Sequence, residues 1–375
     1  MPSNSLDPNQ TEPVSSPEED ILPASPRSKV LAARLLVGLI VLICAEVFSG
    51  ASLQIGLWHP WTVVVTYWLY FAHFFFFTTL AVRTGRTSLS SLYLWGVLFG
   101  LYESWITKVI WSGYNHDGKF VMGSIGPYGL SEISMVFIFH PVMSFILPLA
   151  VACLLCPPLR SIFPELAWFT GKSKGARLVQ FYLVISFAPV MAMNSGGPAN
   201  LVINLAVAIG LLLVLLRLAR STLETSDGLP TVVFGRKGFA GLCIYLGLLY
   251  AVTYFGLQPK GLPSAGVQLF TFVFYVFAAL GLWLHSRRER HAAAPVERLE
   301  LRLMTILFAA LLTLALLLSA LAGGPALYPV IAVNFAIWTL LGFVLTGLSF
   351  AKGAQESYRR GQSSRGQDPS SRFSP

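Results

Sequence analysis

One apolar stretch of the chain carries two charged residues where a membrane-spanning helix normally carries none. The stretch is "FGLYESWITKVIW", residues 99–111, and its charged residues are Glu103 and Lys108. A charged side chain at the middle of a bilayer costs about 2.5 to 3.5 kcal/mol on insertion scales, so it usually faces the interior of a helix bundle and finds a partner there. Glu103 is therefore the first candidate for chemistry, as a general base or as a proton-binding group.

His140 is the partner that the sequence predicts for Glu103. Glu103 lies about 12 Å below Trp111, the residue at the outer end of its span, at a rise of 1.5 Å per residue. His140 lies about 10 Å below the outer end of the next span, which begins near Ile133. The two residues share a depth, so we expect them to meet. The alternative is that His140, which precedes Pro141, is a core histidine with satisfied ring nitrogens.

Other polar residues fall in the same outer half of the membrane. Glu46 lies about 6 Å, Asn204 about 9 Å and Asn334 about 13 Å below the outer ends of their spans. Asn194 ends the fifth span, and Lys108 lies close to the outer end of the third. The sequence therefore predicts a polar pocket in the outer half of the bundle.

Each of these residues also has a structural interpretation. The long side chain of Lys108 can reach the membrane interface by snorkelling. The asparagines are typical of hydrogen bonds between membrane helices or of helix caps. Glu46 can be hydrated near the interface. His73, which is followed by four phenylalanines, is expected to belong to the core.

The composition is that of a polytopic membrane protein. The chain has 375 residues, of which 55% are hydrophobic and 11% charged, and its mean hydropathy is +0.66. Ordinary soluble domains contain about 25% charged residues. The apolar runs are about 20 residues long, as an α-helix needs to cross a bilayer. We expect an all-α bundle of about ten transmembrane helices.

The ten spans are predicted near the following residues: Val30–Gly50, Trp61–Val82, Leu89–Trp111, Ile133–Leu155, Leu178–Asn194, Asn200–Leu216, Gly238–Leu257, Ala265–His285, Leu303–Ala322 and Leu327–Phe350. Lysines and arginines gather in every second loop and in both tails, and the remaining loops hold only Lys119 and Lys260. Since positive charge favours the cytoplasmic side, this alternation predicts that both termini are cytoplasmic. The expected location is the plasma membrane.

The chain divides into three predicted regions. Residues 1–29 are rich in proline and serine and predict a disordered cytoplasmic tail. Residues 30–350 form the transmembrane domain, and residues 351–375 predict a second disordered tail, which is basic. The two "GGPA" hairpins, at residues 196–199 and 323–326, fit either an internal duplication or two independent tight turns.

Three short patterns follow one another in the first half of the chain. They are "EVFSGAS" from Glu46, "GVLFGLYESWITK" ending at Lys108, and "HPVMSFILP" from His140. They resemble a group of uncharacterised prokaryotic multi-pass membrane proteins with the patterns E-x-x-SG-x-S, G-x-x-x-G-x-x-E and H-x-x-x-S-x-x-x-P. The resemblance covers about residues 46–148 and implies a membrane protein without an assigned activity.

More distantly, the chain is similar to the CAAX-protease and bacteriocin-processing family of glutamate intramembrane peptidases. That family has the patterns EExxxR, FxxxH and HxxxN. Glu103 matches the first pattern, with Ser104 in place of the second glutamate and Lys108 in place of the arginine. His140 matches the second pattern, with Val136 in place of the phenylalanine.

The third pattern of that family matches Asn204, with Asn200 in place of the histidine. The resemblance implies a catalytic set of Glu103, His140 and Asn204. In such a set the glutamate and the histidine deprotonate a water molecule, and Asn204 stabilises the oxyanion that develops on the substrate.

Two function classes remain open, and a third is less favoured. The first is an intramembrane peptidase with the catalytic set above. The second is a small-solute transporter that uses the protonatable carboxylate of Glu103. The third is a non-catalytic protein that binds lipid or another membrane protein. In the first two, the expected substrate-binding residues are Glu46, Lys108, Asn194 and Asn334.

No cofactor is predicted, and no nucleic-acid partner. Zinc held by Glu103, His140 and Glu46 is the minority alternative, because the chain has no HExxH pattern. Cys153 and Cys156 have the CxxC spacing, but without a second pair we interpret them as small apolar residues. The expected partners are the lipid bilayer and a peptide or small solute; the sequence leaves the oligomeric state open.

Overall fold

The chain folds as a helix bundle, as its apolar runs predict. The computed structural model describes residues 27–114, 117–120, 122–225, 228–288 and 296–365. In this part of the chain, nine helical segments are long and apolar enough to cross a membrane: Arg27–Val47, Thr62–Thr84, Leu130–Leu155, Lys174–Asn194, Pro198–Glu224, Leu229–Gly256, Ala265–Leu284, Glu300–Leu321 and Tyr328–Gln362. The prediction of an all-α polytopic bundle is confirmed.

The predicted third span is the exception, because it is not one helix. It is divided into α3 (Leu89–Gly100), α4 (Tyr102–Trp105) and α5 (Val109–Ser112). The prediction of a continuous helix over Leu89–Trp111 is therefore wrong. A residue with left-handed backbone, Lys108, separates α4 from α5.

The other elements follow in chain order. The first half contains α1 (Arg27–Leu42), η1 (Ile43–Val47), η2 (Thr62–Thr66), α2 (Tyr67–Thr84), β1 (Ser124–Ile125), β2 (Tyr128–Gly129), α6 (Leu130–Ser134), η3 (Met135–Ile146), α7 (Leu147–Leu155), η4 (Pro157–Ser161) and α8 (Leu166–Thr170). The second half contains α9 (Lys174–Asn194), α10 (Pro198–Thr225), α11 (Leu229–Val232), α12 (Arg236–Gly256), η5 (Pro259–Gly261), α13 (Ala265–Leu284), α14 (Arg298–Leu321), α15 (Gly323–Ala326) and α16 (Tyr328–Arg365). The segments η1, η2 and η3 are π-helices, and β1 and β2 form one short antiparallel hairpin.

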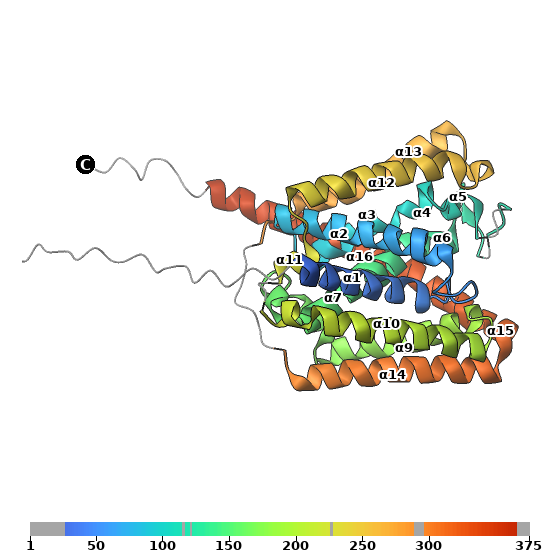
Figure 1. The fold of residues 1–375 in the computed structure, drawn as a ribbon. Helices are drawn as coiled ribbons and strands as arrows, with labels where there is room; N and C mark the ends of the chain where they lie inside the picture. The colour runs from blue at the N-terminus through green and yellow to red at the C-terminus, as the bar shows by residue number, and fades with distance from the viewer. Residues whose placement is uncertain (1–26, 115–116, 121, 226–227, 289–295, 366–375) are drawn as a thin grey trace, which may run out of the picture.

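The bundle has a centre and two outer layers (Figure 1). The helices α1, α2, α3 and α7 run through the centre, α12 and α13 cover one side, and α9, α10 and α14 cover the other. The strongest packing is between α3 and η3. On the outside, α12 packs on α2, α13 packs on α3 and α16, and α14 packs on α9. The elements that carry Glu103 and His140 are therefore enclosed by other helices.

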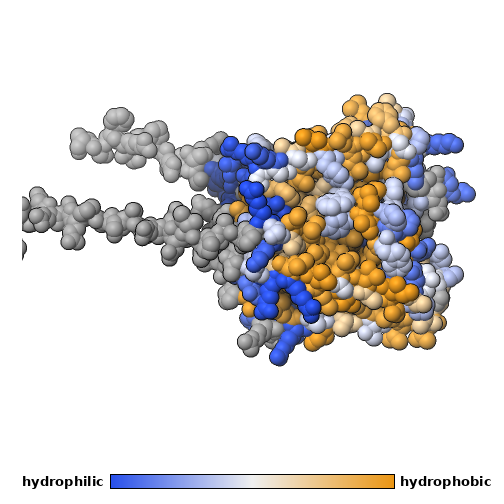
Figure 2. Space-filling model, in the orientation of Figure 1, coloured by the Kyte–Doolittle hydropathy of each residue, from blue (hydrophilic) through white to orange (hydrophobic). Residues whose placement is uncertain are grey.

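The surface matches a membrane protein (Figure 2). A broad apolar band crosses the molecule, and hydrophilic residues gather at the two ends. The described chain begins in α1 and ends in α16 at the same end of the bundle (Figure 1). A common side for both ends agrees with the predicted topology, and the cytoplasmic assignment of that side stays a prediction.

The predicted tails differ in part from the structure. Helix α16 continues to Arg365, so the prediction of disorder is wrong for residues 351–365. Glu356 accepts a hydrogen bond from the backbone of Ser286 at 2.8 Å, which holds this extension against the end of α13. Residues 1–26 and 366–375 lie outside the described residues. Residues 27–29 belong to α1.

Candidate functional site

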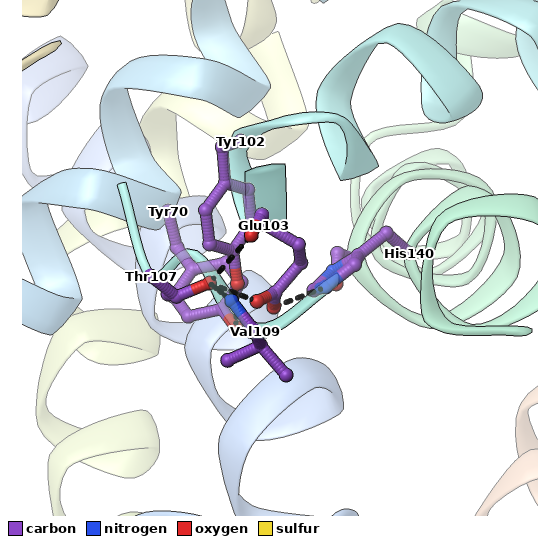
Figure 3. A network of polar contacts seen from close by, with 7 residues as sticks. Tyr70, Tyr102, Glu103, Thr107, Val109 and His140 are labelled. Atoms are coloured by element: carbon purple, nitrogen blue, oxygen red, sulfur yellow. Dashed lines mark hydrogen bonds and ion pairs between the residues drawn. The ribbon is translucent and has the colours of Figure 1, made fainter. Parts of the chain in front are cut away.

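Glu103 and His140 form a hydrogen-bonded pair inside the bundle (Figure 3). His140 Nε2 lies 2.9 Å from Glu103 Oε1. The side chain of His140 is 1% exposed and that of Glu103 is 13% exposed. With the carboxylate ionised, Nε2 carries the hydrogen and donates it. The structure thus brings together the two residues that the sequence predicted to meet, and it leaves the carboxylate as the more accessible of the two.

Neighbouring side chains hold both His140 and Glu103 in place. Ser144 Oγ lies 2.9 Å from His140 Nδ1, and Thr107 Oγ1 donates to Glu103 Oε2. The His140 ring stacks on Phe99, with a centroid distance of 6.0 Å and an angle of 14° between the planes. Partners on both ring nitrogens and an aromatic face fix the orientation of the imidazole.

Small residues on α3 make the pair possible. A Cβ added at Gly96 would lie 2.4 Å from the Pro141 Cα, and one added at Gly100 would lie 3.0 Å from the His140 Cβ. Because these two glycines lack a Cβ, α3 approaches η3 as closely as membrane helices do at a GxxxG face. Glu103 follows directly after this contact. The G-x-x-x-G-x-x-E pattern is therefore the packing face that brings Glu103 to His140.

The pattern around Glu46 builds a second carboxyl group into the same region. Ser52 Oγ donates to Glu46 Oε2 at 2.7 Å, and Ser49 Oγ donates to the Glu46 carbonyl at 3.3 Å. Gly50 has a positive φ of 74°, and a Cβ there would lie 2.5 Å from the Asn194 Cβ. Glu46 also interacts electrostatically with Glu103 and His140. The E-x-x-SG-x-S pattern thus positions this carboxyl group close to the pair.

Two buried tyrosines lie between the carboxyl groups, and the sequence analysis missed them. The hydroxyls of Tyr70 and Tyr102 are 2.8 Å apart, and each tyrosine is 3% exposed. Tyr70 also interacts with Glu46, and Tyr102 interacts with Glu103. In the sequence these tyrosines lie within apolar runs, where nothing distinguishes them from core residues. The position of Tyr102 next to Glu103 was the one available signal.

Glu132 was also missed. It is 1% exposed, its Oε2 accepts a hydrogen bond from Ser131 at 2.6 Å, and its Oε1 has no hydrogen-bond partner among the described residues. It interacts electrostatically with Glu103. The sequence analysis placed it outside the fourth span, which was predicted to begin at Ile133, whereas the helix begins at Leu130. The surroundings of Glu103 therefore hold three buried or half-buried carboxyl groups, those of Glu46, Glu103 and Glu132.

Lys108 does not snorkel, and that prediction is wrong. Its side chain is 0% exposed, and its ammonium donates to the carbonyl of Thr253 at 2.9 Å and to that of Leu257. These carbonyls lie at the C-terminal end of α12, where the helix dipole favours a cation. The left-handed backbone of Lys108, with φ of 60°, directs the chain toward this helix end. Lys108 ties the broken segment to α12 and does not contact Glu103 in any hydrogen bond of the described residues.

The predicted asparagines lie in other contacts. Asn204 Oδ1 accepts from the Leu57 backbone at 2.8 Å, and its Nδ2 donates to the carbonyls of Leu53 at 3.1 Å and Asn200 at 2.9 Å. These bonds attach the loop after Glu46 to α10. The side chain of Asn204 is thereby occupied at both ends, so we leave it out of the proposed catalytic set.

Asn194 and Asn334 connect segments that are distant in the sequence. Asn194 Nδ2 donates to the Ser49 carbonyl at 2.8 Å, and Asn334 Nδ2 donates to the Ser186 carbonyl at 3.2 Å. These are bonds between helices or between a helix and a loop, as membrane bundles commonly use. A role in binding a substrate stays a prediction for both residues.

His73 and the two cysteines of the CxxC pattern lie in the core. His73 is 1% exposed, with its Nδ1 2.8 Å from the Leu69 carbonyl and its Nε2 3.1 Å from the Tyr250 hydroxyl, so its assignment to the core is confirmed. Cys153 and Cys156 are both buried. In the part of the chain that the structure describes, no group of three or more His, Cys, Asp or Glu residues could hold a metal ion.

An aromatic groove adjoins the broken segment on the side of α12 and α13. It has a volume of about 400 Å³ and is lined by Trp105, Tyr250, Ala251, Tyr254, Phe255, Phe272 and Tyr275. The Trp105 ring lies 5.0 Å from that of Phe272 on α13 and 6.4 Å from that of Tyr254 on α12. It therefore contacts both helices. Trp105 and Glu103 belong to the same short helix, α4. One residue of the helix that carries the carboxylate, Trp105, therefore lines the groove.

Comparison with known proteins identifies the family of this chain. A model described as "Uncharacterized membrane protein family" matches residues 35–354. The chain belongs to this family. This uncharacterised membrane protein family covers the spans from α1 to α16, including Glu46, Glu103 and His140. The chain is therefore an integral membrane protein of a recognised family.

One relative extends the comparison to another organism. It is an uncharacterised protein of Archaeoglobus fulgidus that is 35% identical over 118 residues, which is 32% of this chain and 36% of the relative. The match thus spans about a third of each protein. No solved structure matches the chain.

Proposed function

We propose that this protein is a glutamate-type intramembrane hydrolase that cleaves peptide bonds of membrane-embedded substrates. The observation that carries the proposal is the 2.9 Å hydrogen bond between Glu103 and His140, in which the carboxylate is the more accessible partner. A base held by a buried histidine within a water-poor bundle is suited to activating one water molecule. The distant similarity to glutamate intramembrane peptidases, in which Glu103 and His140 match the first two patterns, supports the same chemistry.

The reaction requires one proton to move twice. The Glu103 carboxylate accepts a proton from water while the water oxygen forms a bond to the carbonyl carbon of the substrate. The resulting oxyanion then re-forms the carbonyl, the C–N bond breaks, and the proton passes from Glu103 to the leaving nitrogen. His140 donates to Glu103 Oε1 throughout and keeps the carboxylate in place. The oxyanion partner in this scheme is the Tyr102 hydroxyl, since Asn204 is occupied elsewhere.

The substrate reaches the pair from the side of α12 and α13. The groove between these helices has aromatic walls and opens next to α4, where Glu103 lies. An apolar peptide segment in the bilayer can pack on such walls without exposing charge. Peptides that already lie in the membrane are thus the substrate class that fits best.

Hydrolysis in isotopically labelled water tests this proposal. The full-length protein is reconstituted into liposomes with a panel of synthetic transmembrane peptides in H₂¹⁸O, and the products are analysed by mass spectrometry. We expect cleaved peptides that carry one ¹⁸O atom in the new carboxyl group. Glu103→Gln should reduce the rate by at least about a hundredfold, the low end of the range for positioned acid–base catalysis.

The matched control is Glu224→Gln. Glu224 lies near the end of α10 in an ion pair with Arg220, and its side chain is 60% exposed, so the same substitution there should leave the rate unchanged. If the wild-type protein yields no labelled product from any peptide, or if Glu103→Gln cleaves as fast as wild type, the hydrolase proposal is wrong.

A proton-coupled transporter of small solutes is the second candidate, because the segment that carries Glu103 is broken. Transporters commonly place their substrate and ion sites at discontinuous helices near the middle of the membrane. The break between α3 and α5 has this form. Proton flux across the same liposomes, measured with an entrapped pH dye, separates the candidates: a flux that depends on Glu103 and on an added solute, without ¹⁸O incorporation, favours transport.

A further inference from the structure

The break that follows Glu103 is held to the end of α12. The Lys108 ammonium donates to the carbonyl of Thr253 at 2.9 Å and to that of Leu257. A Cβ added at Gly261, in the short turn η5 that follows α12, would lie 3.4 Å from the Lys108 Cβ. Lys108 is 0% exposed. A displacement of the last turn of α12 therefore displaces the break as well.

The same break reaches the Glu103 carboxylate through Thr107. The Val109 N–H donates to Thr107 Oγ1 at 3.4 Å, and Thr107 Oγ1 donates to Glu103 Oε2 (Figure 3). Val109 is the first residue of α5, where the N–H groups of a helix have no partner within it. The left-handed backbone of Lys108 turns this N–H back toward Thr107. The Thr107 oxygen thus accepts from the backbone, while its one hydrogen is available to the carboxylate.

The Thr107 hydrogen has two acceptors within reach, and both belong to Glu103. Thr107 Oγ1 lies 3.0 Å from the Glu103 carbonyl, which is the usual partner of a threonine four residues later in a helix. It also reaches Oε2, and a bond to an ionised carboxylate is the stronger of the two. Since a hydroxyl has a single hydrogen, its direction decides whether the carboxylate is held on Oε1 alone, by His140, or on both oxygens. A small shift of Thr107 therefore changes the orientation of the carboxylate.

The last turn of α12 is also a wall of the aromatic groove. Tyr254 and Phe255 line the groove, and they lie between the two residues whose carbonyls Lys108 holds. Phe255 is 76% exposed, so an apolar occupant of the groove can pack on it. Such an occupant contacts the turn of α12 that is tied to the break after Glu103.

We propose that this break couples the groove to the Glu103 carboxylate, with Thr107 as the positioning residue. An apolar segment that fills the groove displaces the last turn of α12, and Lys108 and Thr107 pass the displacement to the carboxylate. The coupling rests on the proposed function for its use, because it would orient the base once a substrate peptide is in place. His140 keeps its bond to Oε1 in both orientations.

Filling the groove by substitution tests the coupling without any substrate. Ala251 lines the groove, so Ala251→Phe adds an aromatic ring there. Infrared spectra of the full chain in liposomes are recorded at a pH where Glu103 is ionised, and the difference from Glu103→Gln assigns its carboxylate stretching bands. We expect Ala251→Phe to shift these bands, because the frequency of a carboxylate stretch depends on the hydrogen bonds to its oxygens.

The Thr107 variants complete a double-mutant cycle. Thr107→Val should shift the Glu103 bands, and Thr107→Ser, which keeps the hydroxyl, should retain the wild-type bands. Ala251→Phe should add no further shift to Thr107→Val, because the link between the two sites is already absent. Additive shifts in the double variant overturn the coupling, and so do wild-type bands in either Ala251→Phe or Thr107→Val.

Ala240→Phe and Thr305→Val are the matched controls. Ala240 is exposed on α12 and is not one of the residues that line the groove. Thr305 Oγ1 donates to the Leu301 carbonyl at 2.8 Å, four residues earlier, at a position with no carboxylate in the bond. Both variants should keep the wild-type Glu103 bands. A control that shifts the bands as far as the variant it matches overturns the proposal.

Hydrolysis of the transmembrane peptides gives a second readout, which separates this proposal from the proposed function. Thr107→Val should lower kcat by at least about tenfold, the low end for the loss of a hydrogen bond to a charged group. KM should stay near the wild-type value, because Thr107 is not among the residues that line the groove. Shifted bands without any hydrolysis support the coupling and refute the hydrolase. Hydrolysis with a wild-type kcat in Thr107→Val supports the hydrolase and refutes the positioning role.

Discussion

The first and the second half of this bundle differ in what surrounds their helices. The apolar windows of the first four candidate spans, which run through α1, α2, η3 with α7, and α9, are 50–78% buried. Those of the last five, which run through α10, α12, α13, α14 and α16, are 11–22% buried. The polar side chains of the candidate site, Glu46, Tyr70, Tyr102, Glu103 and His140, all come from the first group or from the broken segment.

This difference follows from the absence of a hydrophobic driving force between helices in lipid. Lipid tails are as apolar as leucine, so membrane helices associate through close packing and hydrogen bonds. The central helices have both, through Gly96 and Gly100 and through the bonds of Glu103 and Lys108. The outer helices present large apolar side chains to lipid. Substitutions should therefore have large effects at the centre and small effects outside.

The largest effect is expected for Lys108→Met. This change removes the cation from the carbonyls of Thr253 and Leu257, which end α12. Buried acceptors that lose a charged partner cost about 3 kcal/mol in the free energy of unfolding. Unfolding by titration with sodium dodecyl sulfate in mixed micelles measures the loss. Lys119→Met, at a side chain that is 85% exposed, should change the stability by less than about 0.5 kcal/mol, and equal losses in the two variants would refute the capping role.

Gly96→Ala should have the next largest effect. The added methyl group would lie 2.4 Å from the Pro141 Cα, so α3 and η3 must separate. Overpacking of this kind costs about 2 kcal/mol, and it should also weaken the infrared signature of the Glu103–His140 pair. Gly241→Ala is the comparison in α12, where nothing lies within 4 Å of the added Cβ. A Gly241→Ala variant that loses as much stability as Gly96→Ala contradicts the close approach.

Asn204→Ala should have a moderate effect on stability and none on hydrolysis. The change removes the bonds that attach the Leu53–Leu57 loop to α10, at a cost of about 1 kcal/mol. The hydrolysis rate for each folded molecule should equal that of wild type, as the ¹⁸O experiment can measure. A rate that falls by more than about tenfold, or 1.4 kcal/mol in the barrier, would return Asn204 to the catalytic set.

The smallest effect is expected for Leu340→Ala on α16. This side chain is 68% exposed and faces the lipid, so the truncated side chain leaves no cavity in protein. The free energy of unfolding should change by less than about 0.5 kcal/mol. A loss of more than about 1 kcal/mol, beyond the usual range for surface substitutions, would show instead that protein covers this face, and cross-linking would then identify the covering chain.

The sequence predicted those features that depend on the hydrophobicity of a whole segment or on the cost of burying one charge. Run length identified the helices, and the expense of an ionised carboxylate in lipid predicted that Glu103 would need a partner such as His140. The sequence did not predict the break at Lys108, because the reason for it lies in α12, which is distant along the chain. Tyr70 and Tyr102 were missed for a related reason: a tyrosine in an apolar run has the same pattern whether its hydroxyl is isolated or bonded.

The π-helical winding of η3 makes the site sensitive to the length of the chain. A π-helix accommodates more residues in each turn than an α-helix does, and it often arises where a residue has been inserted into an α-helix. Each residue turns an α-helix by about 100°. Deletion of one residue between Met135 and Phe139 would therefore let the segment rewind more tightly, while the imidazole of His140 would turn away from Glu103. During evolution, the apolar side chains of this segment can be exchanged for one another, whereas the number of its residues must stay the same.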